Sequence, residues 1–101
     1  MQKVSILGCG WLGKPLAISL ISKGFLVKGS TTSEEKLKWL ADENIIPFLV
    51  DISQEEISKD FLDASVLIIA ITSKNESDFK RLISQIEKAN IQKVIFISST
   101  S

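Results

Sequence analysis

The residues best placed to do chemistry are three glycines near the N-terminus, Gly8, Gly10 and Gly13, which form a G-x-G-x-x-G pattern. Between a strand and a helix, this pattern binds the pyrophosphate of a dinucleotide. Gly8 would permit the tight turn, Gly10 would let the backbone approach the pyrophosphate, and Gly13 would let the helix pack closely on the strand. We expect the N–H groups around Trp11 and Leu12 to point at phosphate oxygens, at the positive end of the helix dipole.

Two neighbouring side chains have simpler interpretations. Cys9 is best explained as a small residue in a tight loop, with no redox role. Trp11 either covers part of the cofactor or packs on the end of the sheet, and both alternatives stay open. A turn that only packs and binds nothing is disfavoured by the strand and helix predicted on either side of it.

The end of the second predicted strand bears on the choice of cofactor. An NAD-specific domain has Asp or Glu there, about 20 residues after the first glycine. The chain instead has the small hydroxyl residues Ser30, Thr31 and Thr32, with a cation nearby, either Lys28 or Lys36. Hydroxyls and a cation suit a 2′-phosphate, so the sequence favours NADP, with NAD as the alternative.

Strands and helices alternate along the chain. β-branched and apolar runs predict strands over residues 3–7, 25–29, 46–51, 65–71 and 93–98. Apolar residues at helical spacing predict helices over residues 12–23, 33–44 and 78–90, and a shorter helix or turn ends near Leu62. The run SVLIIAI has no polar interruption after its first residue, as expected for a strand covered on both faces.

Local signals predict where several elements begin and end. Thr32 with Glu35, and Ser53 with Glu56, match the capping box that opens a helix. Gly24 is a natural helix stop, and Asn44 is a plausible one. Pro47 predicts that the third strand lies at an edge of the sheet, because proline cannot donate a ladder hydrogen bond.

The alternation predicts an α/β fold, a doubly wound parallel sheet of Rossmann type with strand order 3-2-1-4-5. A complete sheet of this type usually continues to a sixth strand, whereas the given sequence ends shortly after the fifth. We therefore interpret residues 1–101 as a single NAD(P)-binding domain, the N-terminal part of a longer protein.

Composition excludes several classes of function. Twelve basic and twelve acidic residues leave no net charge, so no nucleic-acid or membrane partner is expected. No apolar run approaches the length of about 18 residues that a membrane span needs. The chain has no histidine, which argues against a His-ligated metal site, and a single cysteine, which favours a cytoplasmic location.

The sequence resembles the atypical and extended short-chain dehydrogenase/reductases, including proteins similar to NAD-dependent epimerases and dehydratases. The resemblance rests on four segments, ILGCGWLGKPLA, VKGSTTSEEKL, VDI and VIFISSTS. It implies that Ser99 orients the substrate carbonyl or hydroxyl. It also implies two groups of cofactor contacts, the adenine contacts Asp51 and Ile52, and the ribose contacts Ala70, Ile71 and Thr72.

Three departures from that family are visible. Leu7 stands where most short-chain enzymes have their first glycine, which resembles dehydrogenases of the 6-phosphogluconate and ketopantoate type. Thr32 stands where many relatives carry an arginine. The family's Tyr-x-x-x-Lys pair, in which the lysine lowers the tyrosine pKa for proton transfer, is absent because the chain has no tyrosine.

Three functions follow as hypotheses. The first is the cofactor lobe of an NAD(P)-dependent oxidoreductase that moves a hydride to or from a carbonyl, alcohol or sugar-like carbon, with its Tyr-x-x-x-Lys pair downstream. The second is a non-catalytic NAD(P)-sensing module. The third is a lobe of a 6-phosphogluconate or ketopantoate-type dehydrogenase, although the ending IFISSTS favours the short-chain family. Many members of the family dimerise through helices beyond the segment that corresponds to residues 1–101, so the parent protein is a candidate homodimer, but the sequence does not determine its oligomeric state.

Overall fold

A computed structural model describes residues 2–8, 13–50, 57–70 and 76–97. Within these residues, strands and helices alternate as the sequence predicts. In chain order the elements are β1 (Lys3–Leu7), α1 (Gly13–Ser22), β2 (Leu26–Thr31), α2 (Glu35–Ala41), β3 (Ile46–Leu49), α3 (Lys59–Leu62), β4 (Val66–Ile69), α4 (Glu76–Lys88) and β5 (Lys93–Phe96).

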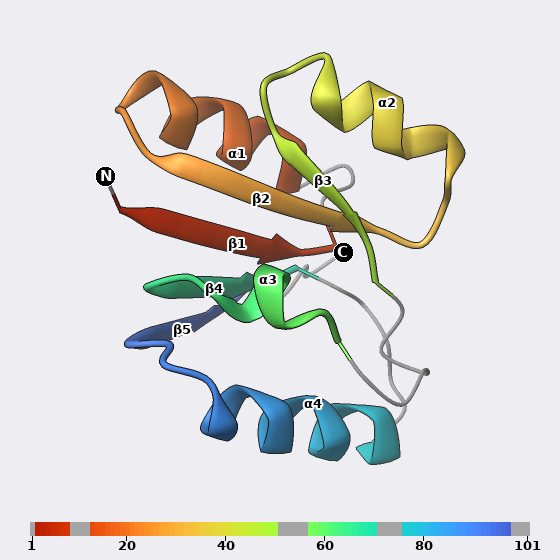
Figure 1. Ribbon diagram of the computed structural model, residues 1–101, viewed down its shortest axis with the longest axis vertical. Helices are drawn as coiled ribbons and strands as arrows, with labels where there is room; N and C mark the ends of the chain where they lie inside the picture. The colour runs from red at the N-terminus through yellow and green to blue at the C-terminus, as the bar shows by residue number, and fades with distance from the viewer. Residues whose placement is uncertain (1, 9–12, 51–56, 71–75, 98–101) are drawn as a thin grey trace.

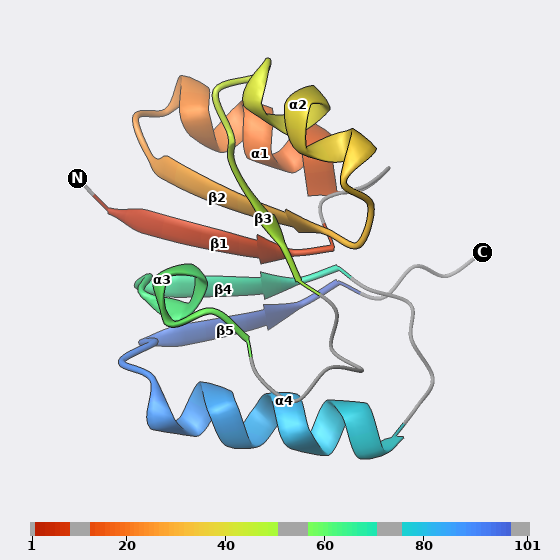
Figure 2. The same ribbon diagram turned by 45° about the vertical axis from the view of Figure 1, so that its right-hand side comes forward.

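The strands form one parallel sheet in the order β3-β2-β1-β4-β5, which confirms the predicted doubly wound topology. Pro47 lies in the edge strand β3, as its missing N–H predicted. Because all the strands are parallel, their carboxyl ends meet at one edge, and Figure 2 shows the arrowheads of β1, β2, β4 and β5 on the same side.

Helices cover both faces of the sheet (Figure 1). Alternate residues of the central strands face opposite sides, so that Ile68 packs with α1 and α2 while Leu67 packs with α3 and α4. One core cluster is built on Val4, Ile6, Ala17, Val27, Leu40, Ile45 and Ile68. The other is built on Leu7, Val50, Ile57, Phe61, Leu62, Leu67, Ile69 and Leu82. Burial on both faces explains the continuous apolar sequence of β4.

The predicted helix stop at Gly24 is confirmed by backbone geometry. Gly24 has φ +93°, and its N–H donates to Ile21 while the N–H of Phe25 donates to Leu20, which ends α1. The predicted end of α2 at Asn44 is three residues too late, because the helix ends at Ala41 with Asp42 as its C-cap. Asn44 has φ +63°, a left-handed conformation that asparagine tolerates better than most residues, and it lies in the turn before β3.

The first predicted capping box is wrong. The residue before α2 is Glu34, itself in helical conformation, and no side chain caps the helix. β2 continues to Thr31, beyond the predicted end at residue 29. The side chain of Thr31 accepts a hydrogen bond from the N–H of Ser33, so the turn is closed by a hydroxyl one residue earlier than predicted.

The second predicted capping box, Ser53 with Glu56, lies outside the described residues. The short helix α3 ends at Leu62, as predicted, but it is only four residues long. Among the described helices, none is both long and apolar enough to cross a membrane.

Candidate dinucleotide-binding site

The glycine turn has the backbone geometry that its sequence predicts at both described glycines. Gly8 has φ +84°, a conformation that residues with a side chain rarely adopt. A Cβ on Gly13 would lie 3.0 Å from the Gly8 carbonyl oxygen and 3.1 Å from Cγ2 of Ile6. A side chain at residue 13 would be crowded against the backbone of Gly8, so glycine there favours the close approach of α1 to β1.

Ser30 supports this turn from the neighbouring strand. Its hydroxyl oxygen accepts a hydrogen bond of 2.8 Å from the N–H of Gly8, and the residue is 1% exposed. The sequence assigned Ser30 to the cofactor phosphate, whereas the structure places its side chain behind the first glycine. Ser30 is thus a positioning residue that holds the turn in register with β2.

The hydroxyl segment after β2 is only partly open to solvent. Thr31 is buried, and its side chain bonds to the N–H of Ser33. Thr32 and, in the first turn of α2, Lys36 are exposed. Residues 28–33 contain no carboxylate. The end of β2 itself therefore offers hydroxyls and backbone N–H groups, and the exposed charged residues Glu34, Glu35 and Lys36 follow in sequence.

Lys28 does not lie at this edge, which corrects one of the two cations suggested for a 2′-phosphate. It is 7% exposed, and its Nζ donates to the carbonyl oxygens of Asp60 and, at 2.9 Å, Asp63. These carbonyls belong to α3 and to the residue that follows it, so Lys28 ties β2 to this helix. Of the two cations suggested for a 2′-phosphate, Lys36 is therefore the one that remains.

The carboxyl ends of β1 and β4 meet beside the turn. The N–H of Ala70 donates to the carbonyl of Leu7 at 2.8 Å, directly before Gly8. The strand order reverses between β1 and β4, and in open parallel sheets ligands bind in the crevice at such a switch point. The fold thus brings the turn and Ala70 together at the location where a nucleotide is expected.

The remaining predicted site residues lie outside the described residues, so their predicted contacts stay predictions. They are Gly10, Trp11, Leu12, Asp51, Ile52, Ile71, Thr72 and Ser99.

A polar network under α3 was not predicted from the sequence. Ser5 and Lys28 are register partners on β1 and β2, and both are buried. The Ser5 hydroxyl donates to the carbonyl of Phe61, next to the residues that Lys28 holds. Ser5 lies among apolar residues in β1, and Lys28 follows two apolar residues in β2; these polar residues in predicted strands were the signal that could have revealed this network.

An exposed ion pair extends the network. Lys3 Nζ lies 3.0 Å from the Asp63 carboxylate. That hydrogen bond, then the charges of Lys3 and Lys28, lower the pKa of Asp63 below its ordinary value of 3.8. The start of β1 is thereby tied to the residue that follows α3.

The sheet topology and the supported glycine turn define an NAD(P)-binding domain of Rossmann type. Residues 3–101 match the model of one family, the NAD binding domain of 6-phosphogluconate dehydrogenase. The chain belongs to this family.

Known proteins resemble the chain over its full length. It is 32% identical to Protein YeeZ of Escherichia coli K12, and covers 42% of that protein. Gre2 of Candida albicans, solved in complex with NADPH, superposes with a TM-score of 0.79 at 19% identity, over 98% of this chain and 37% of Gre2. A conserved protein of unknown function from Silicibacter pomeroyi superposes with a TM-score of 0.75 at 21% identity, over 99% of this chain and 36% of that protein. The chain therefore spans less than half the length of these relatives.

Proposed function

We propose that this chain is the cofactor-binding lobe of an NAD(P)-dependent oxidoreductase. The observation that carries the proposal is the glycine turn at the switch point of the sheet, with Gly13 pressed against Gly8 and Ser30 bonded behind it. A bound nicotinamide would supply the hydride chemistry, and the protein would supply position and electrostatics. The substrate would be a carbonyl, an alcohol or a sugar-like carbon.

The described residues fit a dinucleotide. A turn without side chains at Gly8 and Gly13 leaves the backbone N–H groups at the start of α1 free to face a pyrophosphate. We assign Gly10, Trp11 and Leu12 to the pyrophosphate. We assign Ala70, Ile71 and Thr72 to the ribose, and Asp51 and Ile52 to the adenine. These assignments rest on position in the sequence and on the family resemblance.

NADP is the favoured cofactor. An NAD-specific domain has a carboxylate at the end of β2, which would repel a 2′-phosphate; this chain has the exposed Thr32 there, followed by the exposed Lys36. The similarly folded Gre2 was solved with NADPH, which supports the same choice.

The catalytic groups would come from a longer parent protein. Ser99 would orient the substrate, and a downstream Tyr-x-x-x-Lys pair would transfer the proton. The edge strand β5 exposes 37% of Ile95 and 60% of Phe96, which a following segment of the parent protein would cover. We place this parent in the cytoplasm, with a small-molecule substrate and a homodimeric state.

The family match favours a second candidate, the cofactor lobe of a dehydrogenase of the 6-phosphogluconate type. Its catalytic lysine would lie in a helical second domain rather than in a Tyr-x-x-x-Lys pair. Replacing the tyrosine of a downstream Tyr-x-x-x-Lys pair with phenylalanine separates the candidates. Turnover would be lost in a short-chain enzyme and kept in the second candidate.

Calorimetric titration of the full-length protein with NADPH and NADH tests the proposal. We expect NADPH to bind at least about tenfold more tightly, a difference of about 1.4 kcal/mol. Thr32→Asp should reverse the preference, because a carboxylate repels the 2′-phosphate and accepts from a ribose hydroxyl. Lys38→Gln, on the exposed side of α2, is the matched control and should change neither affinity.

Failure of both cofactors to bind would contradict the proposal. Binding without turnover of any carbonyl or alcohol substrate would instead favour the sensing module.

A further inference from the structure

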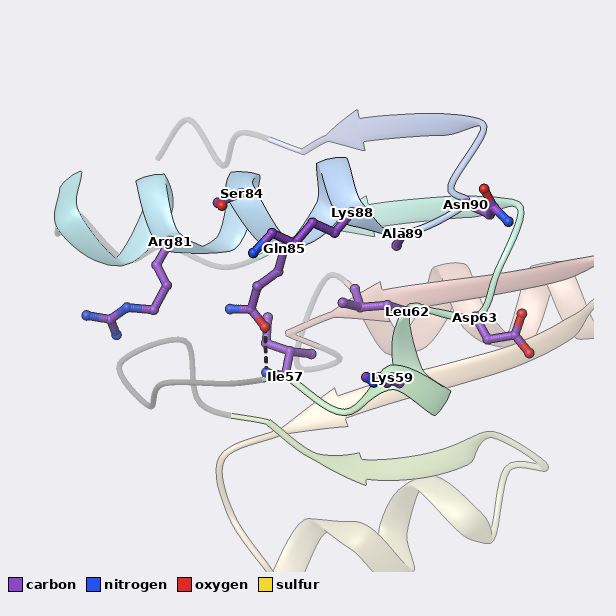
Figure 3. A pocket seen from close by; sticks show the side chains of 10 residues that line it. All are labelled: Ile57, Lys59, Leu62, Asp63, Arg81, Ser84, Gln85, Lys88, Ala89 and Asn90. Carbon is purple, nitrogen blue, oxygen red and sulfur yellow. Dashed lines mark hydrogen bonds between the residues drawn. The ribbon is translucent and has the colours of Figure 1, made fainter.

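The two helices on one face of the sheet leave a hollow between them. Helix α3 has four residues and α4 has thirteen, so α3 covers only part of the surface beside α4. The hollow has a volume of about 740 Å³, within the usual range for small-molecule sites. Figure 3 shows side chains from both helices around it.

The wall of this hollow is held in place by a hydrogen bond between its two sides. The Gln85 side chain on α4 accepts a bond of 2.7 Å from the N–H of Ile57, which precedes α3 (Figure 3, dashed line). Ile57 and Leu62 are buried in the adjoining core, so the floor is apolar and well packed. The hollow is therefore part of the folded structure, with an apolar floor and a polar rim.

The rim is strongly basic. Lys59, Arg81 and Lys88 line the hollow, against one carboxylate, Asp63. That carboxylate is already paired with Lys3 at 3.0 Å. Neither Lys59 nor Lys88 makes an ion pair with any described residue, although the chain as a whole carries no net charge.

The hollow is separate from the glycine turn. Asp63 shortly precedes β4 and Asn90 shortly precedes β5, so this end of the hollow lies at the amino edge of the sheet. The turn follows the carboxyl end of β1, at the opposite edge. A molecule in the hollow would therefore not compete directly with a dinucleotide.

We propose that the hollow between α3 and α4 is a second binding site, for a small phosphorylated molecule. Its phosphate groups would lie against Lys59 and Lys88, and its carbon skeleton against Leu62 and Ala89. A small molecule fits better than an extended acidic peptide, because the basic residues surround a concave hollow instead of following one strip of surface.

Titration of the full-length protein with inorganic tripolyphosphate tests this site. The double variant Lys59→Gln with Lys88→Gln should bind tripolyphosphate about tenfold more weakly or worse, because charge-assisted hydrogen bonds are lost. Lys38→Gln is the matched control, an exposed lysine in the last turn of α2 as Lys88 is in α4, and should leave binding unchanged. Gly13→Ala, which disturbs the cofactor turn, should also leave it unchanged.

Several outcomes would overturn the proposal. One is the absence of tripolyphosphate binding, and another is equal binding by the double variant. Loss of binding in Gly13→Ala alone would assign the anion to the cofactor turn. Capture of a polyglutamate peptide, without tripolyphosphate binding, would show an acidic protein partner instead. Because the double variant should keep its NADPH affinity, failure here is distinguishable from failure of the cofactor proposal.

Discussion

The two faces of the sheet hold their helices in different ways. At the start of α1, the absence of a side chain on Gly13 lets the helix backbone lie close to the backbone of Gly8. At α3, contact is made by polar bonds from the sheet, from Ser5 and Lys28 to the carbonyls at the end of the helix. The four-residue helix α3 buries Phe61 and Leu62, and hydrogen bonds from the strands supplement this packing.

The difference indicates which side is built for a ligand. The start of α1 has N–H groups without helical partners, and it follows a turn with glycines at positions 8 and 13, an arrangement that suits a phosphate. The donors under α3, including the ammonium group of Lys28, already form hydrogen bonds with carbonyl oxygens inside the protein. The start of α1 leaves N–H donors available to a ligand, whereas the network under α3 satisfies the carbonyl acceptors of that helix.

Lys28→Met should produce the largest effect, because it removes the polar contact between β2 and α3. Two charge-assisted hydrogen bonds are lost, and we expect α3 to open more easily by about 3 kcal/mol. Hydrogen exchange of the amides in residues 57–64 measures this opening. Lys36→Met, at an exposed lysine, should change the same exchange by less than about 0.5 kcal/mol. Equal exchange in the two variants would show that α3 is held by packing alone.

Gly13→Ala should affect the other face. The added Cβ meets the backbone of Gly8, which cannot move as a side chain does, so we expect a loss of about 2 kcal/mol in unfolding free energy. Dinucleotide affinity should fall as well, because α1 is pushed away from the turn. Urea unfolding and NADPH titration measure the two effects. Ser19→Ala, at an exposed position on α1, is the control, and a Gly13→Ala protein of unchanged stability would refute the close-packing argument.

Asp63→Asn should give the smallest effect, and the effect should disappear at low pH, where the carboxylate of the natural protein is protonated. The folded pKa of Asp63 is lowered, so the pair with Lys3 stabilises the protein above the ordinary pKa of 3.8. That stabilisation is lost as pH falls through the lower folded pKa. Thermal melting from pH 6 to pH 3 should therefore decline more in the natural protein than in Asp63→Asn, and Asp42→Asn should follow the natural protein. A difference that persists in about 1 M salt would contradict an exposed, screened pair.

Much of the fold could be predicted because its signals are local. The strand SVLIIAI, the stop at Gly24 and the edge position of Pro47 each depend on a few adjacent residues. The capping prediction failed at Thr32 because several neighbouring hydroxyls could close that turn, and the pattern could not choose between them. The structure selects Thr31, which ends a strand longer than predicted.

The sequence by itself determined the order of the elements, the parallel sheet and the glycine turn, since periodicity and glycine spacing act over short stretches of chain. Only the tertiary structure decided that Ser30 supports Gly8, that Lys28 holds α3, and that a basic hollow lies beside α4. These contacts join residues more than twenty positions apart, as in the pair of Gly8 with Ser30 at a separation of 22. Their partners are set by strand register and helix length, which exist only once the sheet has formed.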